Sequence, residues 1–186
     1  MPLLLASQSP RRRALLSMLT EDFTVRAADI KESGYHAASP KELTLVLAKA
    51  KAEGVFRECP GETVIGCDTI VELEGRVLGK PADEADAIDM LSRLSGHRHQ
   101  VHTGVSILYP GGCEQFTETT TVFFSTIPKN EILSVCKTPE PYDKAGAYGI
   151  QGWAARFVPR IEGCYYNAMG LPVSALYRAL SCAGLL

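Results

Sequence analysis

The sequence predicts a single α/β domain over residues 1–186, in which helices flank a mixed, twisted sheet. Strand-like and helix-like segments alternate along the chain, as they do in layered α/β proteins. Two long strand-like segments flank the turn sequence Pro110-Gly111-Gly112, so at least one pair of neighbouring strands should be antiparallel. A chain of 186 residues can bury one sizeable core and is short for two.

Three strands and two helices are expected in the first half of the chain. Residues 2–6 and 23–27 are short apolar segments and residues 62–72 a longer one, all typical of strands. Residues 11–19 carry leucines at helical spacing. A second helix should begin at Ser39, because Pro40 suits the first helical position and Glu42 completes a capping box.

The second half continues the alternation. Asp83 suits the cap of a helix that ends near Gly96. The two hairpin strands are expected at residues 99–109 and 114–124, followed by a helix over 128–136. A Gly-rich loop at 144–152, a strand over 154–161 and a helix from near Pro172 complete the order.

Composition excludes several classes of protein. The formal net charge is −2, which provides no global basic field for nucleic acid. No apolar run approaches the roughly 20 residues of a membrane span, and the apolar start lacks the basic leader of a signal peptide. The six cysteines are scattered without a CxxC pair, which predicts reduced thiols in a cytoplasmic protein.

The strongest functional feature is the segment Ser7-Gln8-Ser9-Pro10-Arg11-Arg12-Arg13. Ser9 can cap the next helix and Pro10 fits its first turn, so three arginines fall where the helix is already partly positive. Such an unfavourable arrangement is explained by a strong anion in front of the helix. Serine hydroxyls, free backbone N–H groups and forked guanidinium groups together suit a polyphosphate.

A lone Arg-Arg-Arg is more often a solvated basic patch, and only its register with strand, cap and proline favours phosphate binding. Two familiar phosphate-binding motifs are approached but not matched in the chain. Residues 75–81 resemble a P-loop but are one residue short, with Pro81 in place of Ser or Thr. The glycines at 146, 149 and 152 do not form GxGxxG.

Asp68 interrupts an apolar strand, where a carboxylate is costly unless metal or hydrogen bonds compensate it. It can hold Mg²⁺ or take a proton from water; the alternative is a salt-bridged acid at a strand bend. Glu32, Lys51 and Lys80, each taken alone, are ordinary surface residues. Gln151, in the Gly-rich loop, can read a base edge, or its loop can be a plain structural turn.

The histidines predict no metal site. On a strand His97 and His99 share one face and His102 points away, which leaves two ligands without a third.

Taken in order, these segments resemble the Maf family of nucleotide pyrophosphatases. The matching blocks are residues 5–12 (LASQSPRR), 66–71 (GCDTIV), 79–81 (GKP), 143–152 (DKAGAYGIQG) and 170–172 (GLP). The resemblance implies an elongated, two-lobed fold like that of inosine triphosphatases, with a central cleft and often a homodimer. It also implies hydrolysis between the α- and β-phosphates of a nucleoside triphosphate.

Carried over by position, the resemblance gives each site residue a role. Asp68 becomes the proton acceptor and, with Glu32, a ligand for a divalent metal, Mg²⁺ or alternatively Mn²⁺. Lys31 departs from the family, where an acidic residue is common beside the glutamate, and this weakens the assignment of Glu32. The remaining residues bind substrate: Arg11, Arg12, Lys51 and Lys80 contact phosphate, and Ser7 and Ser9 line the loop.

Arg12, Thr69 and Gln151 match the family's specificity positions. Together they resemble the branch that acts on dTTP and UTP, and modified pyrimidine nucleotides fit a house-cleaning role. The alternatives are a 7-methyl-GTP pyrophosphatase, or a nucleotide-binding regulator of cell division that does not hydrolyse its ligand and would not need Asp68.

Overall fold

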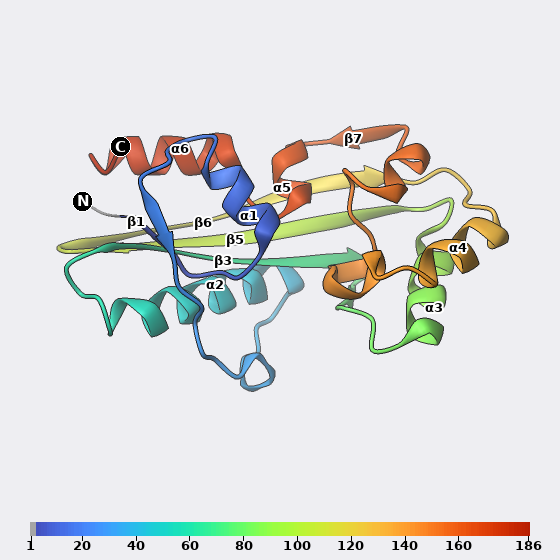
Figure 1. Cartoon of the computed structure of the whole chain (residues 1–186), viewed down its shortest axis with the longest axis horizontal. Coiled ribbons are helices and arrows are strands. Elements are labelled where there is room, and N and C mark those ends of the chain that lie inside the picture. The colour runs from blue at the N-terminus through green and yellow to red at the C-terminus, as the bar shows by residue number, and fades with distance from the viewer. Residues whose placement is uncertain (1–2) are drawn as a thin grey trace.

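A computed structural model describes residues 3–186, whose strands form one seven-stranded mixed sheet in the order β2-β1-β3-β5-β6-β7, with β4 paired to β3 (Figure 1). The strands are β1 (Leu3–Leu5), β2 (Phe23–Val25), β3 (Thr63–Leu73), β4 (Arg76–Leu78), β5 (Arg98–Tyr109), β6 (Gly112–Phe123) and β7 (Arg160–Glu162). The α-helices are α1 (Pro10–Leu16), α2 (Pro40–Phe56), α3 (Glu84–Leu94), α4 (Lys129–Cys136), α5 (Tyr165–Met169) and α6 (Val173–Cys182). Four short 3₁₀ helices are η1 (Glu32–Gly34), η2 (Glu140–Asp143), η3 (Ala145–Ala147) and η4 (Trp153–Phe157). The predicted mixed α/β fold is confirmed.

Three long antiparallel strands give the molecule its elongated shape. β5 pairs with β3 from Val64↔Leu108 to Glu72↔Gln100, and with β6 along its whole length. Figure 1 shows these strands running along the long axis, with α6 near one end and α3 and α4 near the other. The hairpin predicted at Pro110-Gly111-Gly112 is confirmed, with Gly111 at φ +92°.

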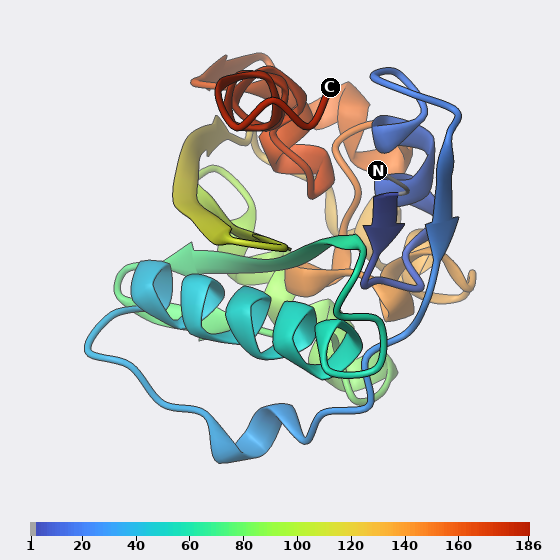
Figure 2. The ribbon, with the colours of Figure 1, turned by 90° about the vertical axis from the view of Figure 1, so that its left-hand side faces the viewer.

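Helices cover both faces of the sheet (Figure 2). α2 packs on one face, where Ala52 and Val55 meet Val64 of β3. α1 and α6 pack on the other, where Leu15 and Leu176 join a core that includes Ile65 and Cys67. Because strand residues alternate between faces, Asp68 of β3 projects toward α2 and Thr69 toward α1 and α5. These two neighbouring residues of β3 therefore face opposite sides of the sheet.

Glycine allows α2 to lie unusually close to the sheet. A Cβ atom at Gly66 of β3 would stand 2.2 Å from the backbone oxygen of Ala48, and one at Gly104 of β5 would stand 2.4 Å from that of Thr44. No real side chain fits at such distances. These two glycines bring Lys51 of α2 within reach of β3.

One edge of β3 is open in its middle. β1 pairs in parallel with Thr63–Ile65, and β4 pairs with Val71–Leu73 along the same edge. Between these two short partners, residues 66–70 pair only with β5 within the described chain. Asp68 and Thr69 lie in this gap, at an edge that a ligand can approach.

Most predicted elements are present, and one is wrong. The strand expected over residues 154–161 is instead η4 followed by the short strand β7. The apolar residues of this segment have helical spacing. Trp153 and Phe157 are four residues apart and their ring centroids lie 5.1 Å apart, and Ala154 between them is fully buried. The strands predicted at 2–6, 23–27 and 62–72 correspond to β1, β2 and β3; Pro2 lies outside the described residues.

The N-cap bonds predicted at Ser39 and Asp83 form. The Ser39 hydroxyl accepts from the Glu42 N–H at 3.2 Å, and the Asp83 carboxylate accepts from the Asp86 N–H at 2.9 Å. All six cysteines are free thiols. No helix in residues 3–186 combines the length and apolar character needed to cross a bilayer.

Candidate active site

A cleft of about 830 Å³ lies at the open edge of β3. It brings together every residue that the sequence analysis assigned to the site. They are Ser7, Ser9, Arg11, Arg12, Glu32, Lys51, Asp68, Thr69, Lys80 and Gln151. These residues come from the N-terminal loop, α1, η1, α2, β3 and two later loops, so only the fold places them side by side.

The N-terminal loop presents two of its three arginines to the cleft. The Ser9 hydroxyl caps α1 by accepting from the Arg12 N–H at 3.4 Å, and Pro10 occupies the first turn. The Ser7 hydroxyl accepts from the Ser9 N–H at 3.2 Å, which fixes the loop before the helix. Arg13 lies exposed and does not line the cleft.

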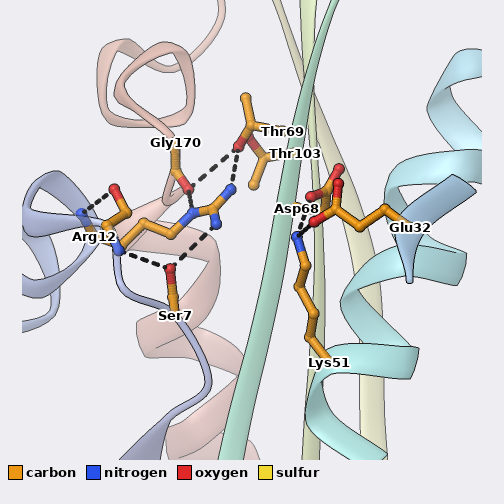
Figure 3. Close-up of polar contacts among 9 residues, drawn as sticks. Ser7, Arg12, Glu32, Lys51, Asp68, Thr69, Thr103 and Gly170 are labelled. Atoms are coloured by element: carbon orange, nitrogen blue, oxygen red, sulfur yellow. Dashed lines mark hydrogen bonds and ion pairs between the residues drawn. The ribbon is translucent and has the colours of Figure 1, made fainter. Parts of the chain in front are cut away.

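Arg12 is held by three different acceptors (Figure 3). Its Nε–H donates to the Gly170 carbonyl at 2.9 Å, and its two terminal nitrogens donate to the hydroxyls of Thr69 at 2.9 Å and Ser7 at 3.3 Å. A guanidinium group carries five N–H groups, so two remain for a ligand. Arg12 is thus a fixed, preorganised donor.

Thr69 continues this network into the core. Its hydroxyl lies 3.0 Å from that of Thr103 on β5, and the Thr103 hydroxyl donates to the Asn167 carbonyl of α5 at 3.2 Å. Thr103 and Asn167 are fully buried.

On the other side of β3, Lys51 joins two carboxylates (Figure 3). Its ammonium lies 2.6 Å from Asp68 Oδ1 and 2.7 Å from Glu32 Oε1. Burial raises the pKa of Asp68, and the opposing charges of Lys51 and Arg12 do not reverse this. Burial acts in the same direction on Glu32, but there the hydrogen bond and charge of Lys51 prevail and lower the pKa. The two acids therefore differ in basicity.

Arg11 faces the cleft with a carboxylate already bound. Its guanidinium lies 2.8 Å from Asp143, which also lies 2.5 Å from the ammonium of Lys144. Burial raises the pKa of Asp143, but the hydrogen bonds from Lys144 and Arg11 prevail and lower it. A phosphate that binds Arg11 must replace or join this carboxylate.

The three histidines between residues 97 and 102 lie in different surroundings. His99 is buried, with its Nε2 2.6 Å from the Tyr148 hydroxyl, and His102 contacts Glu72 and Thr119 at 2.9 Å each. His97 is exposed and precedes β5. The described residues contain no group of three or more His, Cys, Asp or Glu side chains placed to hold a metal.

Comparison with known proteins identifies the family of the chain. The family model for Maf-like proteins matches residues 2–183. The chain belongs to the Maf-like protein family. The dTTP/UTP pyrophosphatase of Carboxydothermus hydrogenoformans is 47% identical to this Maf-like chain over 182 residues, with 97% of each chain covered. That of Koribacter versatilis is 47% identical over 186 residues, covering 100% of this chain and 96% of its own.

A third relative and one solved structure complete the comparison. The dTTP/UTP pyrophosphatase of a Geobacillus species is 47% identical over 182 residues, with 98% of each chain covered. The Ham1 protein of Staphylococcus aureus aligns with 67% of this Maf-like chain and 72% of its own, at 18% identity and a TM-score of 0.46.

The carboxylates of this Maf-like protein fit a divalent cation. Asp68 and Glu32 come from different elements, yet an oxygen of each lies within 2.7 Å of one positive centre, the Lys51 ammonium. Mg²⁺ is commonly held by one or two carboxylates, with phosphate oxygens and water completing its shell. Two converging carboxylates in a cleft also lined by cationic side chains are compatible with that donor set.

Three contributors to the site were missed in the sequence. Thr103 and Asn167 are polar residues that no sequence pattern sets apart from their neighbours. The contribution of Gly170 is a backbone carbonyl, which the amino-acid type does not reveal. The family block at 170–172 pointed to Gly170 without indicating that its backbone oxygen orients Arg12.

Proposed function

We propose that this protein is a nucleoside triphosphate pyrophosphatase that hydrolyses dTTP and UTP to the monophosphate and pyrophosphate. The observation that carries the proposal is similarity, over almost the whole chain, to proteins named dTTP/UTP pyrophosphatases. The cleft supports it, because cationic and carboxylate side chains from separate elements meet there.

The cations of the cleft are assigned to the substrate. A triphosphate carries about four negative charges, and its leaving group gains charge in the transition state, so electrostatic stabilisation dominates this chemistry. Arg11, Lys51 and Lys80 bind the triphosphate in this assignment. Arg12, which the family resemblance also assigns to phosphate, joins them at the Thr69 end of the cleft, and Gln151 is assigned to the base.

Asp68 is assigned as the proton acceptor. Water attacks the α-phosphorus, the bond to the bridging oxygen breaks, and pyrophosphate leaves with the bonding electrons. Asp68 is buried, is oriented by Lys51 at 2.6 Å, and has a raised pKa, which makes it a better base than an exposed aspartate.

Asp68 and Glu32 are also assigned to the metal. A divalent cation bound there supplies charge neutralisation for the phosphate oxygens and lowers the pKa of water. Either Mg²⁺ or Mn²⁺ suits carboxylate and phosphate oxygens. Lys51 would then turn from the carboxylates toward the phosphates.

The cellular setting is part of the proposal. Six free thiols suit a reducing cytoplasm. A homodimer follows from the family resemblance, and the net charge of −2 argues against a nucleic-acid partner. Modified pyrimidine triphosphates are further candidate substrates in a house-cleaning role.

The test is pyrophosphate release from each common nucleoside triphosphate and from 7-methyl-GTP, with Mg²⁺ present. We expect selective release from dTTP and UTP. Asp68→Asn should lower kcat by about a hundredfold or more, the range for a lost general base. Asp89→Asn is the matched control, because Asp89 lies on α3 outside the cleft lining and pairs with Arg93 at 3.6 Å.

Each outcome of this assay is informative. Selective cleavage of 7-methyl-GTP would keep the reaction and overturn the pyrimidine specificity. Tight nucleotide binding without pyrophosphate release would favour the non-hydrolysing regulator. Wild-type turnover by a folded Asp68→Asn protein would remove Asp68 from the mechanism.

A further inference from the structure

The cleft is lined by a further cation that has no role so far. Lys144 lies between η2 and η3, and its side chain is only 13% exposed. Its ammonium donates to the Glu140 carbonyl at 2.6 Å and to Asp143 Oδ1 at 2.5 Å. An ammonium has three N–H groups, so one of them has no acceptor among the described residues.

The packing around Lys144 holds its ammonium in place. A Cβ atom at Gly149 would stand 3.0 Å from Lys144 Cε and 3.2 Å from its Cδ, so the backbone there lies against the stem. The loop is anchored as well, because the Gly146 N–H donates to the Gly79 carbonyl at 3.0 Å. Since Lys80 follows Gly79, Lys80 and Lys144 come from loops that lie side by side.

A single carboxylate joins Lys144 to Arg11. Asp143 presents one oxygen to Lys144 at 2.5 Å and the other to Arg11 of α1 at 2.8 Å. The side chain of Asp143 is 55% exposed, against 24% for Arg11. An ion pair with so exposed a partner adds little stability. The carboxylate can therefore turn into water by side-chain rotation while both cations stay at the cleft.

The charge on Asp143 decides whether a phosphate joins it or replaces it. The hydrogen bonds from Lys144 and Arg11 lower the pKa of Asp143, so this group is an anion near neutral pH. Two anions on the same cations repel each other. A phosphate group carries more negative charge than a carboxylate and forms strong, charge-assisted hydrogen bonds with both arginine and lysine. Replacement is therefore the favoured outcome.

We propose that Lys144 is a further ligand for the triphosphate, and that Asp143 occupies the anion position between Lys144 and Arg11 until a phosphate group displaces it. The inference rests on the proposed function and deepens it. It adds one residue to the phosphate-binding cations and makes Asp143 an internal competitor of the substrate.

The first test is the dissociation constant of inorganic pyrophosphate, the proposed product, measured by titration calorimetry with Mg²⁺ present. Asp143→Asn removes the competing charge, and we expect Kd to fall about threefold, the scale of one exposed ion pair. Asp89→Asn is the matched control, because it removes the same charge from an exposed pair outside the cleft, and its Kd should equal that of wild type. If Asp143 instead serves to orient the two cations, Kd rises in Asp143→Asn; a rise or an unchanged Kd overturns the inference.

The second test concerns Lys144 itself. Lys144→Met should raise Kd for pyrophosphate about tenfold or more, the scale of a hydrogen bond to a charged group. Lys129→Met is the control, because Lys129 is exposed on α4 and does not line the cleft, and it should bind as wild type does. An unchanged Kd in folded Lys144→Met overturns the assignment of Lys144.

A third test needs no variant, so it decides the matter even if Lys144→Met does not fold. Wild-type carboxylates are coupled to glycine ethyl ester by a carbodiimide, with and without pyrophosphate, and quantified by mass spectrometry. Displacement should raise the labelling of Asp143 relative to that of Asp89, which pairs with Arg93 away from the cleft. Equal or lower labelling of Asp143 overturns the inference.

The proposed function is tested separately in the same preparations. Absence of pyrophosphate release from UTP by wild type would refute the proposed function. Normal release from UTP, together with unshifted dissociation constants in Asp143→Asn and Lys144→Met, would overturn the inference alone.

Discussion

At the scale of single residues, Arg12 shows why the loop requires arginine. Its three contacts run to Gly170, Thr69 and Ser7, which lie in different directions around one planar group. Lysine carries a single nitrogen on a flexible stem and cannot reproduce this fork. A positive charge alone is therefore not enough at residue 12; the planar shape of the guanidinium group is also needed.

Arg12→Lys should lower kcat/KM for UTP by about a hundredfold, because two or three hydrogen bonds of about 1 kcal/mol each are lost together. Steady-state pyrophosphate release measures this. Arg13→Lys is the control, since Arg13 is exposed and does not line the cleft, and it should retain wild-type kcat/KM. Wild-type kcat/KM in Arg12→Lys would show that the loop needs only basic charge.

The same scale shows what sequence reasoning can find. Asp68 and the arginine run were detectable because each violates a local rule: a carboxylate in an apolar strand, and cations at a helix start. Thr103 violates none, since threonine is an ordinary strand residue. Its contact with Thr69 depends on the register of the β3–β5 pair, which the sequence alone does not reveal.

At the scale of elements, the contact between α2 and β3 links packing to the site. Gly66 lies two residues before Asp68, and a Cβ atom there would meet the backbone of Ala48 at 2.2 Å and of Ala52 at 2.7 Å. Both belong to α2, the helix that carries Lys51. Any side chain at Gly66 must push this helix away from the strand.

Gly66→Ala should therefore reduce both stability and activity. We expect the free energy of unfolding to fall by about 3 kcal/mol, the upper range for overpacking, and kcat/KM to fall because Lys51 is displaced from Asp68. Denaturant unfolding and pyrophosphate release measure the two effects. Gly61→Ala is the control, because nothing lies within 4 Å of a Cβ atom there. A stable, fully active Gly66→Ala protein would contradict the close contact.

Elements with strong periodicity or caps were predictable, and those defined by tertiary pairing were not. The hairpin of β5 and β6 follows from its turn, and α2 and α3 follow from their caps. β4 and β7 are only three residues long and exist because β3 and β6 provide partners. The strand predicted over residues 154–161 was wrong because a buried helix and a buried strand give the same apolar pattern in so short a segment.

At the scale of the whole molecule, a buried histidine ties stability to pH. His99 packs edge-on against Phe124 and Tyr148, with centroids 5.0 and 5.3 Å away, and its Nδ1 has no partner among the described residues. Burial lowers the pKa of His99 from 6.5 to about 4. The folded protein therefore holds this imidazole neutral in a pH range where the unfolded chain would protonate it.

The sign of the effect follows from proton binding. Above pH 6.5 neither state binds a proton at His99; between 6.5 and about 4 only the unfolded state does, so the free energy of unfolding falls as the pH falls through this window. The loss should approach about 3 kcal/mol near pH 4. Thermal unfolding of wild type and His99→Gln across pH 4–7 measures it, since glutamine keeps a polar partner for Tyr148 but does not titrate. The control is His36→Gln, at an exposed histidine, whose stability should change with pH as that of wild type does. If the stability of wild type and of His99→Gln changed equally with pH, the acid sensitivity would lie elsewhere in the molecule.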